Sequence, residues 1–281
     1  MRLATIRTGD GTHAARVDGN TLVELEYPDV GALLRSGHDP LERAERGEHV
    51  TGAEHPLAGA DFAPVVLDPG KIVCVGVNYA DHIAEMGREA PEFPTLFAKF
   101  TDALIGARDA IVLPGVSDMV DWEVELAVVI GRTVRHASPD EAAAAIAGFT
   151  VANDISMRDF QNRTLQWLQG KTFEHATPVG PWMVTPDEVG GTAPDLELTC
   201  EVDGVVRQRS RTSQLVFGPA AVVAYLSNVV SLRPGDLVLT GTPGGVGNAM
   251  DPPVYLHAGE VVRTAIEGIG ELVNSCVPEM P

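Results

Sequence analysis

The chain has 281 residues and a mass of 29.8 kDa, and its 39 acidic residues against 20 basic ones give a net charge of −19. A polypeptide this acidic repels phosphate backbones and anionic lipids, so neither nucleic acid nor a membrane surface is an expected partner. Hydrophobic residues make up 44% of the chain, which is enough to build a folded core. Three scattered cysteines and the lack of a signal-peptide segment predict a cytoplasmic protein with reduced thiols.

Residues 1–66 are predicted to form a small N-terminal α/β domain, and residues 67–281 a larger second domain. The segment 49–70 is rich in turn-forming residues and is interpreted as the connector between them. Within the first unit, apolar patterns and turn residues predict strands at 3–8 and 21–25 and short helices near 29–36 and 40–47.

The second unit is predicted to be β-rich, with an α+β rather than a doubly wound α/β arrangement. Its 20 prolines and 29 glycines, counted over the whole chain, indicate many turns, and strands do not alternate regularly with helices. Asn78 and Ser138 are predicted to cap helices, and Gly148 to end the second of these. The other predicted elements are strands at 71–77 and 121–131, a hairpin at 196–208, a helix at 219–230 and a strand before 242.

Two glutamates on the strand at 121–131 are the first candidate for chemistry. Successive side chains of a strand point to opposite faces, so Glu123 and Glu125 share a face, with Cα atoms about 7 Å apart. Two carboxylates this close repel each other unless a proton or a cation lies between them. A hard divalent cation fits them, and the alternative is a solvated outer strand face.

Two more segments carry groups that suit the chemistry of an anionic substrate. Asp154, Arg158 and Gln161 are spaced to share one face of a predicted helix and offer a carboxylate, a guanidinium fork and an amide; the alternative is a capping Asp with an ordinary ion pair. His82 and Glu85 lie three residues apart on the helix after Asn78, an arrangement typical of a general base, although a surface pair is the simpler interpretation.

Two turn-rich loops complete the set. Lys171, one of only three lysines, follows a glycine in the first. The second, at 240–247, follows a strand and offers consecutive backbone N–H groups, but it matches neither a P-loop nor a dinucleotide-binding turn.

Taken together, these segments resemble the fumarylacetoacetate hydrolase family over roughly residues 70–277. The resemblance lies in their collinear order, which is more specific than any single motif. The motifs are GVNYADH (76–82), FAKF (97–100), DWEVELAVVIG (121–131), VANDISMRDFQ (151–161), GKTFEHATPVGPW (170–182) and GDLVLTGTPGGVG (235–247).

The resemblance implies a mixed β-sandwich roll, usually assembled as a homodimer, with Mg²⁺ (Mn²⁺ or Ca²⁺ as alternatives) held by a carboxylate triad. It implies the following roles in this chain: metal ligands Glu123, Glu125 and Asp154; catalytic residues His82 and Glu85, as a water-activating dyad, and the family lysine Lys171; and substrate contacts from Arg158, Gln161 and Thr242.

These residues predict a metal-dependent enzyme acting on a small anionic oxo acid. The main hypothesis is hydrolytic C–C cleavage of a 2,4-dioxo acid of the acylpyruvate or fumarylpyruvate kind. The cation stabilises an enolate, and His82, oriented by Glu85, activates the water. The alternative is decarboxylation or isomerisation of an oxo-dicarboxylate such as oxaloacetate, or of a hydroxy-dienedioate such as 2-hydroxyhepta-2,4-diene-1,7-dioate, in the breakdown of aromatic compounds. A non-catalytic cation-binding domain is the third hypothesis.

Overall fold

The computed structural model describes residues 1–85, 87 and 89–280. The larger of its two main sheets contains twelve strands within these residues: β1 (Arg2–Thr8), β2 (Gly11–Asp18), β3 (Thr21–Leu25), β4 (Val50–Pro56), β5 (Asp61–Phe62), β6 (Ile72–Gly76), β7 (Thr95–Lys99), β8 (Leu104–Ile105), β11 (Val124–Ile130), β12 (Ile146–Asn153), β14 (Thr177–Val184) and β17 (Leu237–Leu239). Their order is β4-β3-β2-β1-β14-β12-β11-β17-β6-β7, with β5 on β1 and β8 on β14. Most neighbours are antiparallel; β17–β6 and β14–β8 are parallel.

A smaller sheet packs against the middle of the larger one. It has the order β16-β15-β18-β19-β9, and its strands contact β11, β12 and β14. Its members are β9 (Ile111–Leu113), β15 (Glu197–Val202), β16 (Val205–Arg211), β18 (Val261–Ile266) and β19 (Gly270–Pro278), and a separate two-stranded ladder joins β10 (Val120–Asp121) to β13 (Ser156–Met157). Two packed sheets with few helices confirm the β-rich α+β sandwich expected from the sequence.

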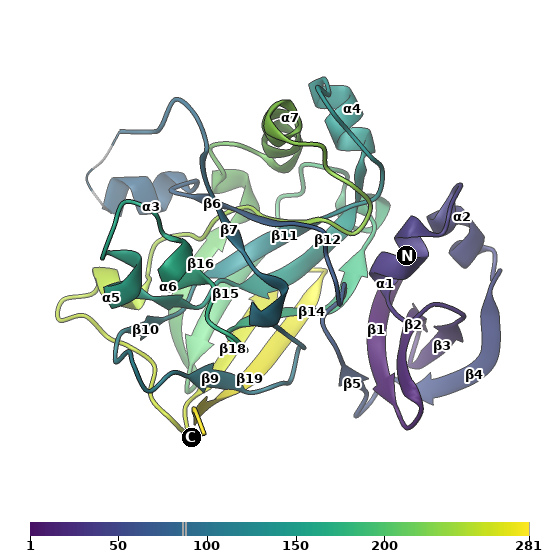
Figure 1. Cartoon of the computed structure of the whole chain (residues 1–281), viewed down its shortest axis with the longest axis horizontal. Coiled ribbons are helices and arrows are strands. Elements are labelled where there is room, and N and C mark those ends of the chain that lie inside the picture. Colours follow the sequence, from purple (N-terminus) through teal and green to yellow (C-terminus); the bar gives the residue numbers. More distant parts are fainter. Residues whose placement is uncertain (86, 88, 281) are drawn as a thin grey trace.

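The helices of the described residues are short, and the longest has 11 residues. They are α1 (Val30–Arg35), α2 (Pro40–Glu45), α3 (Ala80–Glu85), α4 (Pro139–Ala144), α5 (Arg158–Gln161), α6 (Leu168–Lys171) and α7 (Pro219–Val229), with 3₁₀ turns η1 (Thr101–Ala103), η2 (Pro186–Val189), η3 (Thr212–Gln214) and η4 (Gly247–Ala249). Figure 1 shows α3, α5 and α6 together at the end of the molecule opposite the N-terminal strands. Within the described residues, no helix combines the length and the apolar character needed to cross a bilayer.

The first strands continue the main sheet rather than forming an isolated one. Strand β1 pairs antiparallel with β14, placing Leu3 opposite Met183, although β1–β4 with α1 and α2 form a distinct lobe in Figure 1. The helices expected near 29–36 and 40–47 are confirmed as α1 and α2. The segment 49–70 is not simply a connector, because it contains β4, which pairs with β3, and β5, which pairs with β1.

Ser138 caps α4 as predicted, but the predictions for Asn78 and Gly148 are wrong. Asn78 does not cap α3: its amide donates to the carbonyls of Phe217 and Thr240 and its oxygen accepts from the Phe217 N–H, so it ties distant loops together. The helix that begins after Ser138 ends at Ala144, and Gly148 lies inside β12. A Cβ at Gly148 would lie 2.4 Å from the carbonyl oxygen of Val184, so close approach of strands explains this glycine.

Strand β11 is buried along its whole length and separates two halves of the core. Val124, Leu126 and Val128 belong to the cluster facing the smaller sheet, whereas Ala127 and Val129 face the cluster beneath α1. This division matches the predicted alternation of the strand. Glu125 lies on the second face, and its carboxyl group is buried in the protein interior at 1% exposure.

Candidate active site

Three carboxylates meet at one end of the β11–β12 pair. The strands are antiparallel with Val124 opposite Asn153, so the residue before β11 and the residue after β12 lie side by side, and the Asp154 N–H donates to the Glu123 carbonyl at 2.9 Å. Glu125 is the second residue of β11. Ligand atoms of Glu123, Glu125 and Asp154 all lie within 4.8 Å of one another, so the structure brings together the triad predicted from sequence.

The triad does not lie on regular elements in the expected way. Asp154, Arg158 and Gln161 do not share a helix, because α5 begins only at Arg158 and is preceded by β13. The three side chains nevertheless meet at the carboxylate triad. Arg158 forms an ion pair with Glu123, which lies beside Asp154, and donates to the Gln161 amide oxygen at 2.8 Å. Likewise, Glu123 stands just before β11 rather than on it.

Three buried cations face these carboxylates. Lys171, at the end of α6, lies 2.7 Å from Glu123 and 2.9 Å from Asp154. Lys99, the last residue of β7, pairs with the other oxygen of Asp154. Arg158 lies 2.7 Å from Glu123, and its Nε and Nη2 donate to Asp121 at 2.8 Å.

The two glutamates of the triad have opposite proton affinities. Burial alone would raise the pKa of Glu123, but contact with Lys171 and Arg158 outweighs it and lowers that pKa to about 2. Burial, reinforced by the charges of Asp154 and Glu123, raises the pKa of Glu125 well above its usual value. The difference follows from the partners, because Glu125 accepts a hydrogen bond from the Gly241 N–H at 2.7 Å but has no ion pair among the described residues.

This donor set fits a hard divalent cation. Carboxylate oxygens are the ligands that Mg²⁺, Mn²⁺ and Ca²⁺ prefer, and the buried Glu125 carboxylate lacks the positive partner that a cation would provide. Four carboxylates, counting Asp121, face three cations here, so the fully ionised cluster carries one net negative charge. A divalent cation would make the cluster net positive and suited to an anion.

A cavity of about 290 Å³ opens beside this cluster. Its lining includes most of the predicted site residues, namely His82, Glu123, Arg158, Gln161, Lys171 and Thr242. A shallower groove of about 890 Å³ crosses the outer face of the smaller sheet and contains none of them. The chemistry therefore belongs to the smaller cavity.

His82 forms one wall of the cavity through α3. Its Nδ1 donates a hydrogen bond to Glu85 at 2.9 Å, so Nε2 is the ring nitrogen that does not contact Glu85. The other Glu85 oxygen accepts from the Gly245 N–H at 3.2 Å, so the dyad is connected to the loop containing Thr242. Glu85 itself does not line the cavity and acts on it only through His82.

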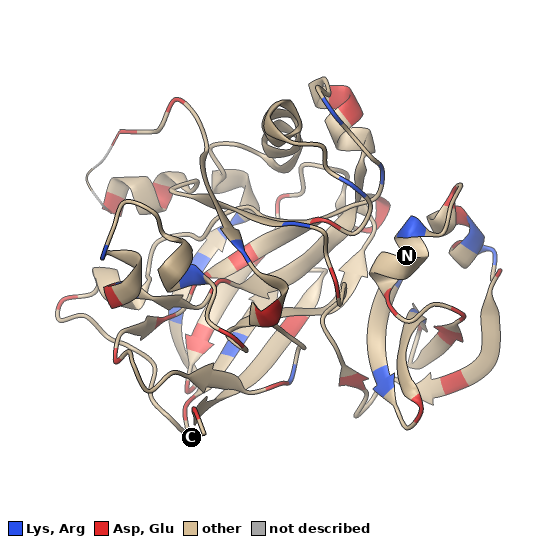
Figure 2. Cartoon of the chain, in the orientation of Figure 1, with Lys and Arg blue, Asp and Glu red and all other residues tan. Residues whose placement is uncertain are grey.

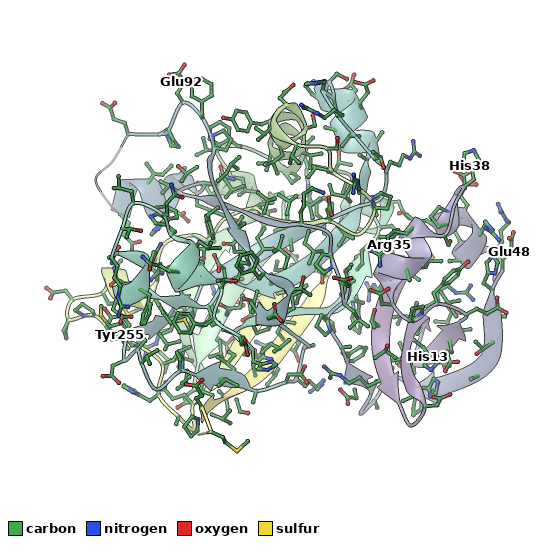
Figure 3. The ribbon with its side chains drawn as sticks, viewed as in Figure 1. His13, Arg35, His38, Glu48, Glu92 and Tyr255 are labelled. Carbon is green, nitrogen blue, oxygen red and sulfur yellow. The ribbon has the colours of Figure 1, made fainter. Side chains whose placement is uncertain are left out.

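Several residues that shape the site were not predicted from the sequence. Asp121 anchors Arg158 and also accepts from the backbone N–H groups of Gly247 and Asn248, on the loop where Tyr255 is labelled in Figure 3. The Asn153 amide oxygen accepts the Glu123 N–H at 2.8 Å, and Gln208 accepts the next N–H along. Asp121 and Asn153 lie within two of the motifs, at 121–131 and 151–161, whereas no local signal marks Gln208.

Backbone conformation also shapes the wall that β6 contributes. Val77 has a φ of 57°, which is strained for a β-branched residue. Its neighbour Asn78 fixes the segment through the three hydrogen bonds described above. A Cβ at Gly76 would lie 2.2 Å from the ring of Trp167, so only glycine lets that ring close the cavity beside β6.

Comparison with known proteins agrees with this architecture. Residues 71–277 match the family described as Fumarylacetoacetate (FAA) hydrolase C-terminal, and the chain belongs to that family. It is 41% identical to the mitochondrial oxaloacetate tautomerase Fahd2a of Rattus norvegicus over 262 residues, which cover 93% of this chain and 83% of the relative.

Solved structures of similar proteins have the same fold. The 5-carboxymethyl-2-hydroxymuconate delta-isomerase of Mycobacterium smegmatis is 37% identical, with a TM-score of 0.81 over 99% of this chain and 100% of its own. The 2-hydroxyhepta-2,4-diene-1,7-dioate isomerase of Mycobacterium marinum is 35% identical, with a TM-score of 0.80 over the whole of both chains. These relatives are named for tautomerisation or isomerisation, which favours the isomerase alternative over the hydrolase hypothesis.

Proposed function

We propose that this protein is a divalent-metal-dependent tautomerase or isomerase of a small oxo-dicarboxylate, with oxaloacetate as the first candidate substrate. The observation that carries the proposal is a buried carboxylate triad ringed by lysine and arginine beside a cavity walled by a histidine–glutamate dyad. The names of the similar proteins support the class of reaction.

Tautomerisation moves one proton between the carbon next to an oxo group and the oxo oxygen. No carbon–carbon bond breaks and no water is consumed, so the protein must supply a base that returns its proton and a setting that tolerates enolate charge. Glu123, Glu125 and Asp154 would hold the cation, which when bound acts as a Lewis acid toward the oxo oxygen.

His82 is assigned the proton transfer. Glu85 accepts the hydrogen of Nδ1 and thereby orients the ring, which leaves the lone pair of Nε2 to take the proton from carbon. In the keto-to-enol direction the protonated ring then gives this proton to the oxo oxygen, and the enol-to-keto direction reverses both transfers. The same residue would activate water in a hydrolase, so its position alone does not separate the two reactions.

Lys171, Arg158 and Gln161 are assigned to the substrate. Burial alone would lower the pKa of Lys171, but Asp154 and Glu123 outweigh it and raise that pKa, so the ammonium supplies fixed charge rather than a base. The ion pairs with Asp121 and Glu123 orient Arg158. Because Arg158 donates to the Gln161 oxygen, the Gln161 NH₂ group remains available to a carboxylate.

A substrate panel with Mg²⁺ tests the proposal. Oxaloacetate enol–keto exchange is followed by ultraviolet absorbance, while carbon dioxide and carboxylic-acid release are measured for oxaloacetate, acylpyruvates, fumarylpyruvate and hydroxymuconate-type acids. We expect enol–keto exchange to be the fastest reaction. Faster acid release from an acylpyruvate would restore the hydrolase hypothesis, and Mg²⁺ binding without any turnover would leave only a cation-binding domain.

A further inference from the structure

We infer that Gln208 is a positioning residue that makes the hydroxyl of Thr242 a hydrogen-bond donor to an oxygen of the substrate. The inference rests on the proposed function, because it takes the cavity beside the triad to hold an oxo acid. It extends that function by explaining how the cavity would select oxygen acceptors, through a residue on β16 far in sequence from the active-site motifs.

Gln208 is buried at 1% exposure and makes three hydrogen bonds. Its Oε1 accepts from the Val124 N–H at 2.9 Å, and its Nε2 donates to the Thr242 hydroxyl oxygen at 2.8 Å and to the Pro243 carbonyl at 3.0 Å. Every hydrogen of the amide NH₂ group is therefore used.

The orientation of this amide is fixed by its partners. A backbone N–H can only donate, so the Gln208 atom facing Val124 must be the oxygen. A carbonyl can only accept, so the atom facing Pro243 must be the nitrogen. Reversing the amide would oppose two donors at one end and two acceptors at the other, and buried mismatches of this kind are costly.

The consequence falls on Thr242, which lines the cavity at 7% exposure. Its oxygen accepts a hydrogen from Gln208, and a hydroxyl has only one hydrogen of its own to donate. Within the part of the chain that the structure describes, this hydroxyl donates to no protein group. Its single hydrogen is therefore free to donate into the cavity, where it suits a carboxylate, oxo or enolate oxygen.

Gln208 also links this donor to the carboxylate triad. Val124, whose N–H it holds, lies between Glu123 and Glu125. One buried side chain thus connects the strand carrying the acids with the loop carrying the donor. A substrate oxygen bound by Thr242 is in this way held at a fixed place relative to the metal ligands.

A double-mutant cycle on oxalate binding tests this link. Oxalate, a dianion with only oxygen acceptors, is titrated calorimetrically in the presence of Mg²⁺ into the wild type, Gln208→Met, Thr242→Val and the double variant. Each single change should weaken oxalate binding roughly 10- to 100-fold, the range for a hydrogen bond to a charged group. In the Thr242→Val background, Gln208→Met should cost almost nothing further.

The other outcomes each overturn a definite statement. Equal losses from Gln208→Met in both backgrounds would mean that Gln208 does not act through Thr242, and unchanged oxalate binding in Gln208→Met would remove its role altogether. Failure of the wild type to bind oxalate would contradict the proposed oxo-acid site itself. Val206→Thr, an isosteric change at a 45% exposed position of the same strand, is the control and should bind oxalate normally.

A second pair of variants covers the case in which Gln208→Met folds poorly. Gln208→Glu retains an acceptor for the Val124 N–H but adds a negative charge that could repel oxalate. The same double-mutant cycle separates this repulsion from the loss of the Thr242 contact, because the repulsion would persist in the Thr242→Val background. Thr242→Ser, which keeps the hydroxyl, should restore most of the oxalate affinity lost in Thr242→Val. Wild-type affinity in Thr242→Val would overturn the inference without any change at Gln208.

Discussion

The floor and the wall of the cavity are built on different principles. The floor is the buried cluster of the carboxylate triad and its charged partners, namely Glu123, Glu125, Asp154, Asp121, Lys99, Lys171 and Arg158. Its groups have almost no solvent exposure and are fixed by their neighbours. Asp154, for example, is 0% exposed and is held by both Lys99 and Lys171. The wall is α3, a six-residue helix in which Ile83 alone is buried among the described residues and the Glu85 side chain is 35% exposed.

This contrast separates two tasks that the proposed reaction needs. Moving a buried charge away from its partners costs several kcal/mol, so the floor keeps its geometry whether or not a ligand is present. A helix of two turns has little stability of its own, and α3 relies on a few contacts such as that of Glu85 with Gly245. In the proposed reaction the floor therefore sets the charge, and the wall presents His82, the proposed proton-transfer group.

The charges of the whole chain do not by themselves attract the proposed substrate. Figure 2 shows acidic and basic residues scattered along the ribbon rather than gathered in separate regions. With a net charge of −19, the protein as a whole repels an oxo-dicarboxylate. Attraction must therefore come from the local cluster, and chiefly at short range, since salt screens longer distances.

The largest effect is expected from removing one acid of the floor. Glu125→Gln should lower Mg²⁺-dependent turnover by roughly 10³-fold or more, because a first ligand and its charge are lost together. Glu125 has a raised pKa in the folded protein, so without metal its ionised form opposes folding above the pKa of the unfolded chain. The metal-free variant should thus unfold at or above the wild-type temperature, but Mg²⁺ should no longer raise that temperature.

Thermal unfolding with and without Mg²⁺, together with the turnover assay, checks this. Glu197→Gln, a change of an exposed glutamate at the start of β15, is the matched control and should behave as the wild type. Retention of a Mg²⁺-induced shift in Glu125→Gln would show that the metal binds elsewhere.

Removing the proton-transfer group of the wall should have the next largest effect. His82→Gln should reduce turnover roughly 10²- to 10⁴-fold, the usual contribution of a positioned acid–base group, while Mg²⁺ and oxalate binding stay close to wild type. Steady-state kinetics and calorimetry test the two halves of this statement. His257→Gln removes an exposed histidine and serves as the control. Full turnover in His82→Gln would transfer the role to another group.

The sequence predicted which acids meet in the floor better than it predicted the elements that carry them, and the reasons are physical. Glu123, Glu125 and Asp154 adjoin two strands whose apolar alternation is strong, and their motifs lie in collinear order, so their meeting could be predicted before the structure. Asp154 was nevertheless misplaced on a helix, because helical spacing alone does not show where a helix begins.

Other parts of the site depend on contacts between distant segments. Asn78 resembles a helix cap in sequence, but it bonds to loops more than 130 residues away. Gln208 stands in an ordinary hairpin strand, and only the packing of the smaller sheet against β11 gives it a role. The pairing of β1 with β14 is equally long-range, and no local pattern in the N-terminal segment could predict it.

Within the floor, the shape of a cation should matter as well as its charge. Arg158→Lys keeps the positive charge but loses the fork that reaches Asp121 and Glu123 together. We expect KM for an oxo-dicarboxylate to rise roughly 10-fold, consistent with the loss of a charged hydrogen bond, and kcat to change less. Arg263→Lys, on the outer face of the smaller sheet, is the control, because its exposed ion pairs contribute little. Equal effects of the two changes would show that only net charge matters.

The smallest expected effect concerns protons released by the floor when metal binds. Because the pKa of Glu125 is raised in the metal-free protein, part of the population carries a proton that must leave before the carboxylate can ligate a cation. Mg²⁺ affinity should therefore increase with pH until that group is fully ionised and then level off. Titration of Mg²⁺ in two buffers of different ionisation enthalpy should detect a fractional proton release, and Glu125→Gln should abolish it. Glu123, whose pKa is about 2, adds nothing to the release near neutral pH because it is already ionised there. A Mg²⁺ affinity independent of pH, with no proton release, would mean that Glu125 is already ionised in the metal-free floor and that the neighbouring lysines hold its charge after all.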